Sequence, residues 1–333
     1  MLRIGVLGAG HLGKIHLKCL QLAHKHFILE GFFDTDPAIR ANVAETMQIP
    51  AFPSAEALIN AVDVVDIVTP TASHFPLAAE AIRQKKHVFI EKPLTHTLQE
   101  AEALIQMSRD HNIKVQVGHV ERFNPALLAL GNMPLQPMFI EAHRLAMFNP
   151  RGTDVSVVLD LMIHDLDIVL SMVNSPVSRV DASGVAVVSD TPDIASARIE
   201  FENGCTANLT ASRISLKQMR KVRLFQRDAY ISLDFLDKTA QVVRLSDHAN
   251  AFPENNAAME FPSNNGVKYL FLDTPSIASG NAIQMELEAF AESILHGERP
   301  RVDIQDGYLA LKLAYQIIDS IDSKFNKNQH LHA

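Results

Sequence analysis

Short apolar runs alternate with segments of helical periodicity along the first 120 residues. Continuous apolar strands separated by helices of about 10–15 residues are typical of βαβ units, in which helices cover both faces of a parallel sheet. The pattern therefore predicts a doubly wound parallel α/β domain over residues 1–121. The predicted strands are residues 2–7, 28–33, 62–68, 87–90 and 114–117.

The pattern changes after residue 121. A long apolar segment is followed by short runs with strand-like alternation, and tight turns between such runs indicate mostly antiparallel pairing. We therefore predict a C-terminal α+β domain with a large open sheet over residues 122–333. Within it we expect a long helix over 155–173, a loop over 249–266 and two closing helices over 281–296 and 305–323.

Composition narrows the class of protein. The net charge of −8 and the absence of a dense basic run argue against a nucleic-acid-binding surface. No uncharged apolar run reaches the roughly 18 residues of a membrane span. Cys19 and Cys205 are the only cysteines, so neither a disulfide framework nor a cysteine zinc site is expected. Because a strand is predicted from residue 2, we expect no leader peptide and a cytoplasmic protein. We also expect no bound metal.

A glycine-rich turn joins the first strand to the first helix. Residues 8–13 read GAGHLG, which fits the G-x-G-x-x-G pattern in its required strand–turn–helix setting. Gly8 permits the tight turn, Gly10 lets a pyrophosphate approach the backbone, and Gly13 allows close packing of helix on strand. A turn that binds nothing is the alternative. The expected cofactor contacts are Gly8, Gly10, His11, Leu12 and Gly13.

Asp34 ends the second predicted strand, 21 positions after Gly13. A carboxylate at this place accepts hydrogen bonds from the adenosine ribose in Rossmann domains. Asp36 adds a second negative charge, and the nearest arginine in the sequence is Arg40. A 2′-phosphate would meet repulsion there, so the sequence favours NAD over NADP.

Two further strand ends carry polar residues. Ligands of open α/β sheets bind at the carboxyl ends of the strands, which makes these residues candidate cofactor contacts. The alternative for Lys92 is a solvated surface charge. The alternative for the segment from Thr69 to His74 is an ordinary helix-capping turn. The candidates at these ends are Thr69, Pro70, Thr71, His74, Glu91 and Lys92.

A polar stripe runs along the apolar helix predicted over 155–173. Asp160, His164, Asp167 and Ser171 are spaced so that they share one face of a helix. Unpaired polar groups are costly to bury, so the stripe either faces solvent or lines a cavity.

Three motifs in order resemble one known family. The strand-end Glu91-Lys92-Pro93, the segment 118–125 (GHVERFNP) and the pair Asp160 and His164 follow the Rossmann fingerprint. In this combination the chain resembles the Gfo/Idh/MocA family of NAD(P)-dependent sugar and cyclitol oxidoreductases. The resemblance implies a Rossmann domain and an α+β domain whose open sheet commonly forms homodimers or homotetramers.

The resemblance also implies a catalytic set. Lys92 matches the family's active-site lysine, and Asp160 and His164 match its acid–base pair. His164 would accept the hydroxyl proton while Lys92 stabilises alkoxide character, or the two roles are exchanged. Residues 153–159, directly before Asp160, contain no glycine, whereas family members often have glycines there.

The substrate expected from the resemblance is a sugar, most closely a UDP-linked N-acetylhexosamine oxidised at C3. Arginines suit phosphate or carboxylate, with ordinary surface charge as the alternative. A cyclitol dehydrogenase, an imine reductase, an NAD-dependent glycosidase and a non-catalytic NAD or sugar sensor remain alternative functions. The candidate substrate contacts are Lys92, His119, Arg122, Asn124, Arg144, Arg151, Asp160 and His164.

Overall fold

The computed structural model describes residues 1–149, 155–249, 251, 259–263 and 266–331. The chain divides into two compact units, which are treated separately below. The first unit comprises residues 1–123 and 280–312, and the second comprises residues 124–279 and 313–333.

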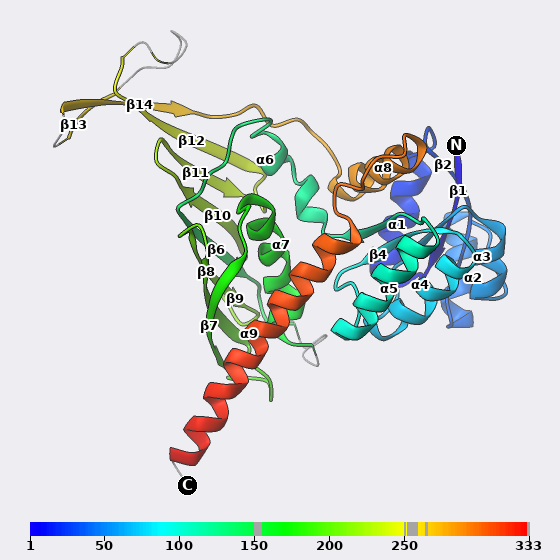
Figure 1. The fold of residues 1–333 in the computed structure, drawn as a ribbon. Coiled ribbons are helices and arrows are strands. Elements are labelled where there is room, and N and C mark those ends of the chain that lie inside the picture. The colour runs from blue at the N-terminus through cyan, green and yellow to red at the C-terminus, as the bar shows by residue number, and fades with distance from the viewer. Residues whose placement is uncertain (150–154, 250, 252–258, 264–265, 332–333) are drawn as a thin grey trace. The chain divides into compact units, whose positions relative to one another are not determined.

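The first unit is built on a five-stranded parallel sheet with strand order β2-β1-β3-β4-β5 (Figure 1). The predicted doubly wound domain is therefore confirmed, and each predicted strand lies within three residues of an observed one. Its strands are β1 Leu2–Leu7, β2 Phe27–Phe33, β3 Val64–Ile67, β4 His87–Glu91 and β5 Val115–Gly118. Its helices are α1 His11–Leu22, α2 Pro37–Met47, α3 Ala55–Ala61, α4 His74–Arg83, α5 Leu98–Asp110 and α8 Ala282–Leu295, with 3₁₀ turns Thr71–Ser73 and Val120–Phe123.

Helix α8 shows why the unit boundary differs from a simple cut at residue 121. Its Leu287 and Phe290 are fully buried in one core with Ile4 of β1 and Phe89 of β4. Residues 280–312 therefore belong with the parallel sheet, although the sequence places them in the C-terminal domain. This assignment depends on packing between segments that are far apart in the sequence, and such packing leaves no local sequence pattern.

The second unit is built on a nine-stranded sheet with order β13-β14-β12-β11-β10-β6-β9-β8-β7 (Figure 1). All pairs are antiparallel except β6 with β9, which confirms the mostly antiparallel open sheet. Its strands are β6 Phe139–Leu145, β7 Val177–Val185, β8 Ile194–Phe201, β9 Thr206–Ser212, β10 Met219–Phe225, β11 Ala229–Asp234, β12 Thr239–Ser246, β13 Met259–Ser263 and β14 Gly266–Asp273.

Helices cover one face of this sheet. Helix α6 (Pro125–Leu128), helix α7 (Ile163–Met172) and the later part of α9 (Ile304–Leu331) contribute to its core. Leu166 of α7 and Ile317 of α9 are fully buried with the inward side chains of the strands. Helix α9 thus begins in the first unit and continues into the second from residue 313.

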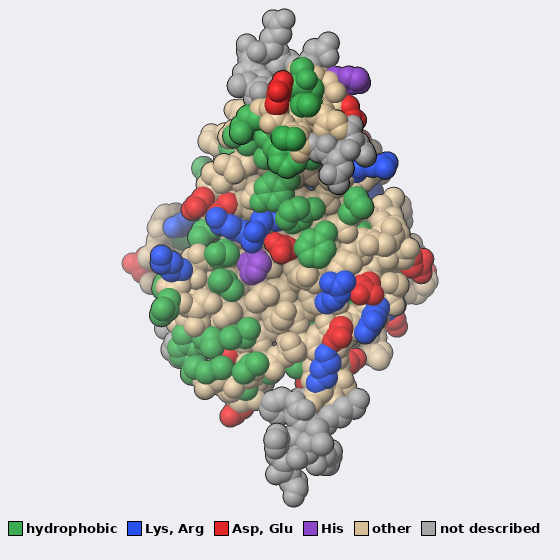
Figure 2. All heavy atoms as spheres, turned by 90° about the vertical axis from the view of Figure 1, so that its left-hand side faces the viewer, with side chains coloured by type: hydrophobic (Ala, Val, Ile, Leu, Met, Phe, Trp, Pro, Cys, Tyr) green, Lys and Arg blue, Asp and Glu red, His purple; other side chains and the backbone are tan. Residues whose placement is uncertain are grey.

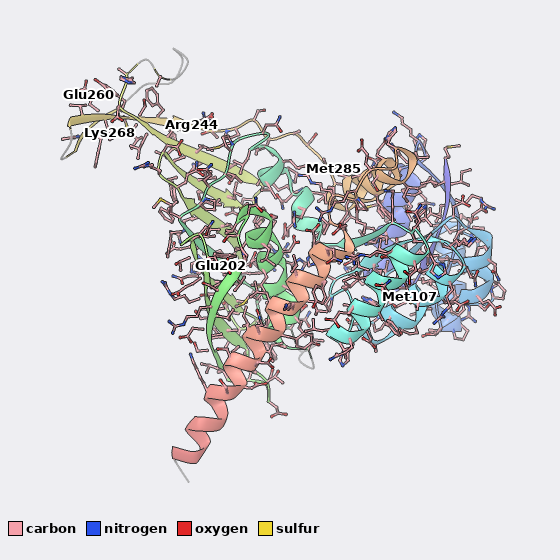
Figure 3. All side chains as sticks on the ribbon, in the orientation of Figure 1. Met107, Glu202, Arg244, Glu260, Lys268 and Met285 are labelled. Atoms are coloured by element: carbon pink, nitrogen blue, oxygen red, sulfur yellow. The ribbon has the colours of Figure 1, made fainter. Side chains whose placement is uncertain are left out.

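Three strands were not expected from the sequence. Strand β6 lies in a stretch with no predicted element, and β13 with the start of β14 replaces part of the loop predicted over 249–266. Figure 3 labels Glu260 on β13 and Lys268 on β14, and these two strands pair as a hairpin.

Among the described residues, no helix combines the length and apolar character that crossing a membrane requires.

We predict that Gly13→Ala destabilises the first unit. A Cβ at position 13 would collide with the carbonyl oxygen of Gly8, so α1 must move away from β1. The expected loss in free energy of unfolding is about 1–3 kcal/mol. Urea unfolding followed by circular dichroism measures this loss.

Gly10→Ala is the matched control. No heavy atom lies within 4 Å of a Cβ at position 10, so the expected cost is below about 1 kcal/mol. Equal stability of the two variants would contradict the proposed contact between Gly13 and Gly8.

Candidate active site

The glycine turn of the first unit presents an open helix N-terminus. No side chain caps the N-terminus of α1, and its first turn contains no acidic residue. Gly10 and His11 are exposed, and the space above Gly10 is free of protein atoms. Free backbone N–H groups and the positive end of the helix dipole attract phosphate. The turn therefore fits the pyrophosphate of a dinucleotide.

Asp34 fastens the end of β2 to this turn. Its Oδ2 accepts a hydrogen bond from the Ala9 N–H at 2.7 Å, and its Oδ1 accepts one from the Asp36 N–H at 2.9 Å. Arg40 donates to the carbonyl oxygens of Asp34 and Thr35, at 2.6 and 3.3 Å. A cation is therefore present at this strand end, although its donors are directed at the backbone.

His74 is buried beneath the loops that follow β3 and β4. Its Nδ1 lies 3.0 Å from the Pro93 carbonyl oxygen, and its Nε2 lies 2.9 Å from that of Thr69. Burial lowers the pKa of His74, which favours a neutral ring that donates to one of the two carbonyls. His74 therefore links the loop carrying Thr69, Pro70 and Thr71 to the loop after Lys92.

Lys92 is half-buried and follows β4 directly. Its backbone N–H donates to Oε2 of Glu91 at 3.2 Å, and the Lys92–Pro93 peptide bond is cis. Oε1 of Glu91 lies 3.1 Å from Nε2 of His16, a residue on α1. The other ring nitrogen of His16 faces Asp66 of β3, at 2.9 Å.

His16 and Asp66 were not predicted as site residues. Both side chains are completely buried. The sequence does carry one signal, because Asp66 interrupts the apolar strand Val64–Ile67, where a lone carboxylate would be costly. His16 follows the glycine turn by three positions, but only the folded unit shows that its side chain points toward Asp66 and Glu91.

In the second unit, Asp160 and His164 lie where two helical forms meet. Asp160 is in a π-helical turn, Val158–Met162, and His164 is in the first turn of α7. Both residues are half-buried, whereas Asp167 is 1% exposed. The predicted stripe is thus split, with Asp160 and His164 near the surface and Asp167 in the interior. Single π turns inside helices occur frequently at functional sites.

A buried ion pair fixes the helix that carries His164. Arg144 of β6 donates to both carboxylate oxygens of Asp165, at 3.1 and 2.9 Å. The two residues are 3% and 2% exposed. Arg144, a candidate substrate contact by sequence, is therefore directed at Asp165 and holds α7 against the sheet.

The remaining candidate substrate residues have different environments. His119 is 1% exposed in the first unit. Asn124 is buried and caps α6, since its Oδ1 accepts from the Ala126 N–H and its Nδ2 donates to the Phe235 carbonyl. The buried cap explains Asn124 structurally. Arg151 lies outside the described residues.

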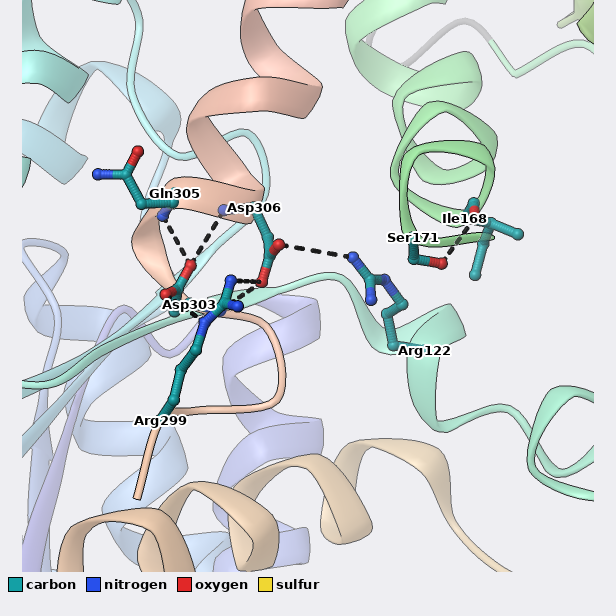
Figure 4. A network of polar contacts seen from close by, with 7 residues as sticks. All are labelled: Arg122, Ile168, Ser171, Arg299, Asp303, Gln305 and Asp306. Carbon is teal, nitrogen blue, oxygen red and sulfur yellow. Dashed lines mark hydrogen bonds and ion pairs between the residues drawn. The ribbon is translucent and has the colours of Figure 1, made fainter. Parts of the chain in front are cut away.

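Arg122 lies beside a charged cluster of the first unit (Figure 4). Its guanidinium is 4.0 Å from a carboxylate oxygen of Asp306, and 14% of its side chain is exposed. Arg299 bridges Asp303 and Asp306 at 2.6 and 3.1 Å. Burial raises the pKa of Asp306, while the positive charges of Arg122 and Arg299 act in the opposite direction.

Within the described ranges, no three or more His, Cys, Asp and Glu side chains are grouped to hold a metal ion. His16, Asp66 and Glu91 agree with this result. The two ring nitrogens of His16 face different carboxylates, so the three side chains do not converge on one point.

Comparison with known proteins defines the class. An "Oxidoreductase family, NAD-binding Rossmann fold" model matches residues 2–119, and a "GFO/IDH/MocA C-terminal domain" model matches residues 140–230. The chain is therefore an NAD-binding oxidoreductase. It belongs to the Gfo/Idh/MocA family, as the resemblance of its motifs indicated.

Individual relatives cover nearly the whole chain. UDP-N-acetylglucosamine 3-dehydrogenase from Acidithiobacillus ferrooxidans is 36% identical over 97% of this chain and 98% of its own length. Its solved structure matches with a TM-score of 0.86 at 35% identity, covering 97% and 98% of the two chains. A scyllo-inositol dehydrogenase from Lactobacillus casei, solved with NAD(H) and scyllo-inositol, shares the fold at 21% identity, with 97% and 98% coverage and a TM-score of 0.74.

We predict that Arg144→Met destabilises the second unit by about 3–5 kcal/mol, because it leaves the Asp165 carboxylate buried without its partner. The double variant Arg144→Met/Asp165→Leu removes both charges and should recover most of that loss. Urea unfolding followed by circular dichroism measures both variants. Additive losses in the double variant would show that the pair is not coupled.

Proposed function

We propose that the chain oxidises a secondary alcohol of a nucleotide-linked sugar of the UDP-N-acetylhexosamine type, with NAD as the hydride acceptor. The observation that carries the proposal is the 36% identity over 97% of the chain to a UDP-N-acetylglucosamine 3-dehydrogenase. The presence of Lys92, Asp160 and His164 supports turnover rather than sensing, because a binding protein has no need of an acid–base set.

The proposed mechanism assigns one role to each of these residues. NAD, which the glycine turn from Gly8 to Gly13 would hold, would supply the hydride-accepting chemistry. His164 accepts the hydroxyl proton, for which an imidazole is suited because its ordinary pKa lies near neutrality. Asp160, four positions earlier, orients the ring and stabilises the imidazolium that forms. The Arg144–Asp165 pair supports this arrangement by fixing α7.

Lys92 would donate a hydrogen bond to the reacting oxygen and stabilise its developing negative charge. Its place at the carboxyl end of β4 supports this role, because ligands of open α/β sheets bind at such ends. Arg122 and His119 are the proposed substrate contacts of the same unit. An arginine suits the diphosphate of a nucleotide sugar.

We predict that Lys92→Ala and His164→Ala each lower kcat by at least about 100-fold, because each removes a group that acts on the reacting oxygen. Absorbance at 340 nm with NAD and UDP-N-acetylglucosamine measures turnover, and NADH fluorescence measures cofactor binding. The affinity for NADH should remain close to that of the unmodified protein.

Lys25→Ala, at an exposed position of the first unit, is the control and should retain full activity. Wild-type turnover in both site variants would refute the assignment. Activity with free inositols but not with UDP-sugars would favour a cyclitol dehydrogenase instead.

We also propose that the outer face of the large sheet joins copies of this chain into a homodimer or homotetramer. One apolar row crosses five paired strands, from β6 to β14. Phe225 and Leu272 in this row are 37% and 54% exposed, and Figure 2 shows apolar side chains gathered on this face. Exposed apolar surface of this kind favours association. The row is Phe139, Phe225, Tyr230, Val243 and Leu272.

We predict that Phe225→Glu weakens this association, because it places a charge in the centre of the apolar row. Light scattering after size-exclusion chromatography should give two or four copies for the unmodified chain and a smaller species for the variant. Leu22→Asp, an exposed apolar position on α1, is the control and should not change the mass. A monomeric unmodified chain would rule the proposal out.

The proposed compartment is the cytoplasm. Cys19 and Cys205 are both free and buried thiols, as is usual in a reducing compartment.

A further inference from the structure

Three charged side chains are buried together at the carboxyl ends of β3 and β4. His16 of α1 lies between Asp66 and Glu91, with Nδ1 2.9 Å from an Asp66 oxygen and Nε2 3.1 Å from a Glu91 oxygen. His16 and Asp66 are 0% exposed and Glu91 is 8% exposed. Such a group is costly to bury unless its charges compensate one another.

While Asp66 and Glu91 are both ionised, the hydrogen-bonding pattern makes His16 an imidazolium. A carboxylate only accepts hydrogen bonds, and a neutral imidazole has only one N–H to donate. Because each ring nitrogen of His16 faces a carboxylate, both contacts are favourable only when both nitrogens carry a proton. The resulting cation lies between two anions that would otherwise repel each other.

The surroundings of His16 agree with this charge state. Burial alone lowers the pKa of His16, but the attraction and hydrogen bonds of Asp66 and Glu91 outweigh it and hold the pKa well above its usual value. Phe89 packs against the His16 ring in a T-shaped arrangement with the ring centroids 5.7 Å apart, and the Cys19 thiol, whose pKa burial raises, interacts with the same ring. Burial also raises the pKa of Asp66, and the His16 cation acts in the opposite direction. While both carboxylates are ionised, the contribution of His16 to stability is complete below about pH 6.5 and is lost as the pH rises through the raised pKa of His16.

The Glu91 carboxylate connects this cation to Lys92. One of its oxygens faces His16, and the other accepts the Lys92 backbone N–H at 3.2 Å. On another side, Gly118 of β5 packs so closely that a Cβ there would lie 2.8 Å from the carboxyl group. The carboxylate is thus fixed by an ionic contact, a backbone hydrogen bond and a lack of space.

We propose that His16, as a buried imidazolium shared by Asp66 and Glu91, is a positioning residue that sets the orientation of Lys92. The inference rests on the proposed role of Lys92 in turnover. His16 does not touch substrate or cofactor in this role. It keeps Glu91 in the one place from which the carboxylate fixes the start of the loop carrying Lys92.

Steady-state kinetics of His16→Gln test the inference. Glutamine supplies no charge, and both of its N–H donors are on one nitrogen rather than on two separate ring nitrogens, so kcat should fall by about 10- to 100-fold through misplacement of Lys92. KM for the sugar and the affinity for NADH should each change by less than about threefold, because the binding groups remain. A general loss of structure would instead change all three quantities together.

A second substitution separates charge from packing. In His16→Gln/Asp66→Asn a neutral amide replaces the Asp66 carboxylate. Repulsion on Glu91 is thereby relieved, and part of the lost kcat should return. His26→Gln is the matched control, because His26 also contacts a carboxylate of the same unit, that of Glu292 at 2.7 Å. It should retain the kcat of the unmodified protein. A double variant no more active than His16→Gln would overturn the electrostatic argument.

Nitrogen-15 NMR of the unmodified protein with labelled histidine tests the charge state without any variant. One imidazole should show both nitrogens protonated at pH 8, where histidines of ordinary pKa are neutral. The absence of such a signal would overturn the inference even if the variants fail to fold.

Lys92→Ala in the same assay separates the two levels of the proposal. If Lys92→Ala is inactive and His16→Gln keeps its kcat within twofold, the positioning role is refuted while the proposed function stands. If Lys92→Ala turns over normally, the proposed function fails and the positioning role fails with it.

Discussion

The close approach of α1 to the end of β1 is the constraint on which the first unit depends. Position 13 has no space for a Cβ beside the Gly8 carbonyl, so a larger residue would push the helix away. Because the helix lies this close, His16 on its next turn reaches Asp66 and Glu91 at the ends of β3 and β4. The spacing that leaves the backbone N–H groups of the glycine turn open therefore also brings His16 to the carboxylate that directly precedes Lys92.

The parallel sheet could be predicted from the sequence because its strands are buried on both faces. Val64, Val65 and Ile67 are all 0% exposed, and such strands appear as continuous apolar runs. Strand β6 was missed because its inward positions are Ile140, Ala142 and Arg144, so a charge interrupts the apolar alternation. Only the folded unit shows that Asp165 neutralises this charge.

The candidate site was predictable to a similar degree. Lys92, Asp160 and His164 stand in motifs with fixed spacing, which a single sequence displays. Asn124 stands in such a motif as well, but its environment is that of a buried helix cap. His16 lies in an ordinary helix, and its proposed role depends on contacts with two carboxylates that are 50 and 75 positions away. Contacts of this range depend on the packing of strands, which spacing along the chain does not encode.

Each unit contains a buried ionic group next to a residue proposed to act in turnover. In the first, His16 and its carboxylates adjoin Lys92, and in the second, Arg144 and Asp165 adjoin His164. Buried ion pairs contribute little net stability compared with apolar side chains of similar size. They do fix the orientation of the side chains involved, because an ion that makes two hydrogen bonds fits in one orientation. We therefore attribute the burial of charge at these two places to the need to hold adjacent side chains in fixed positions.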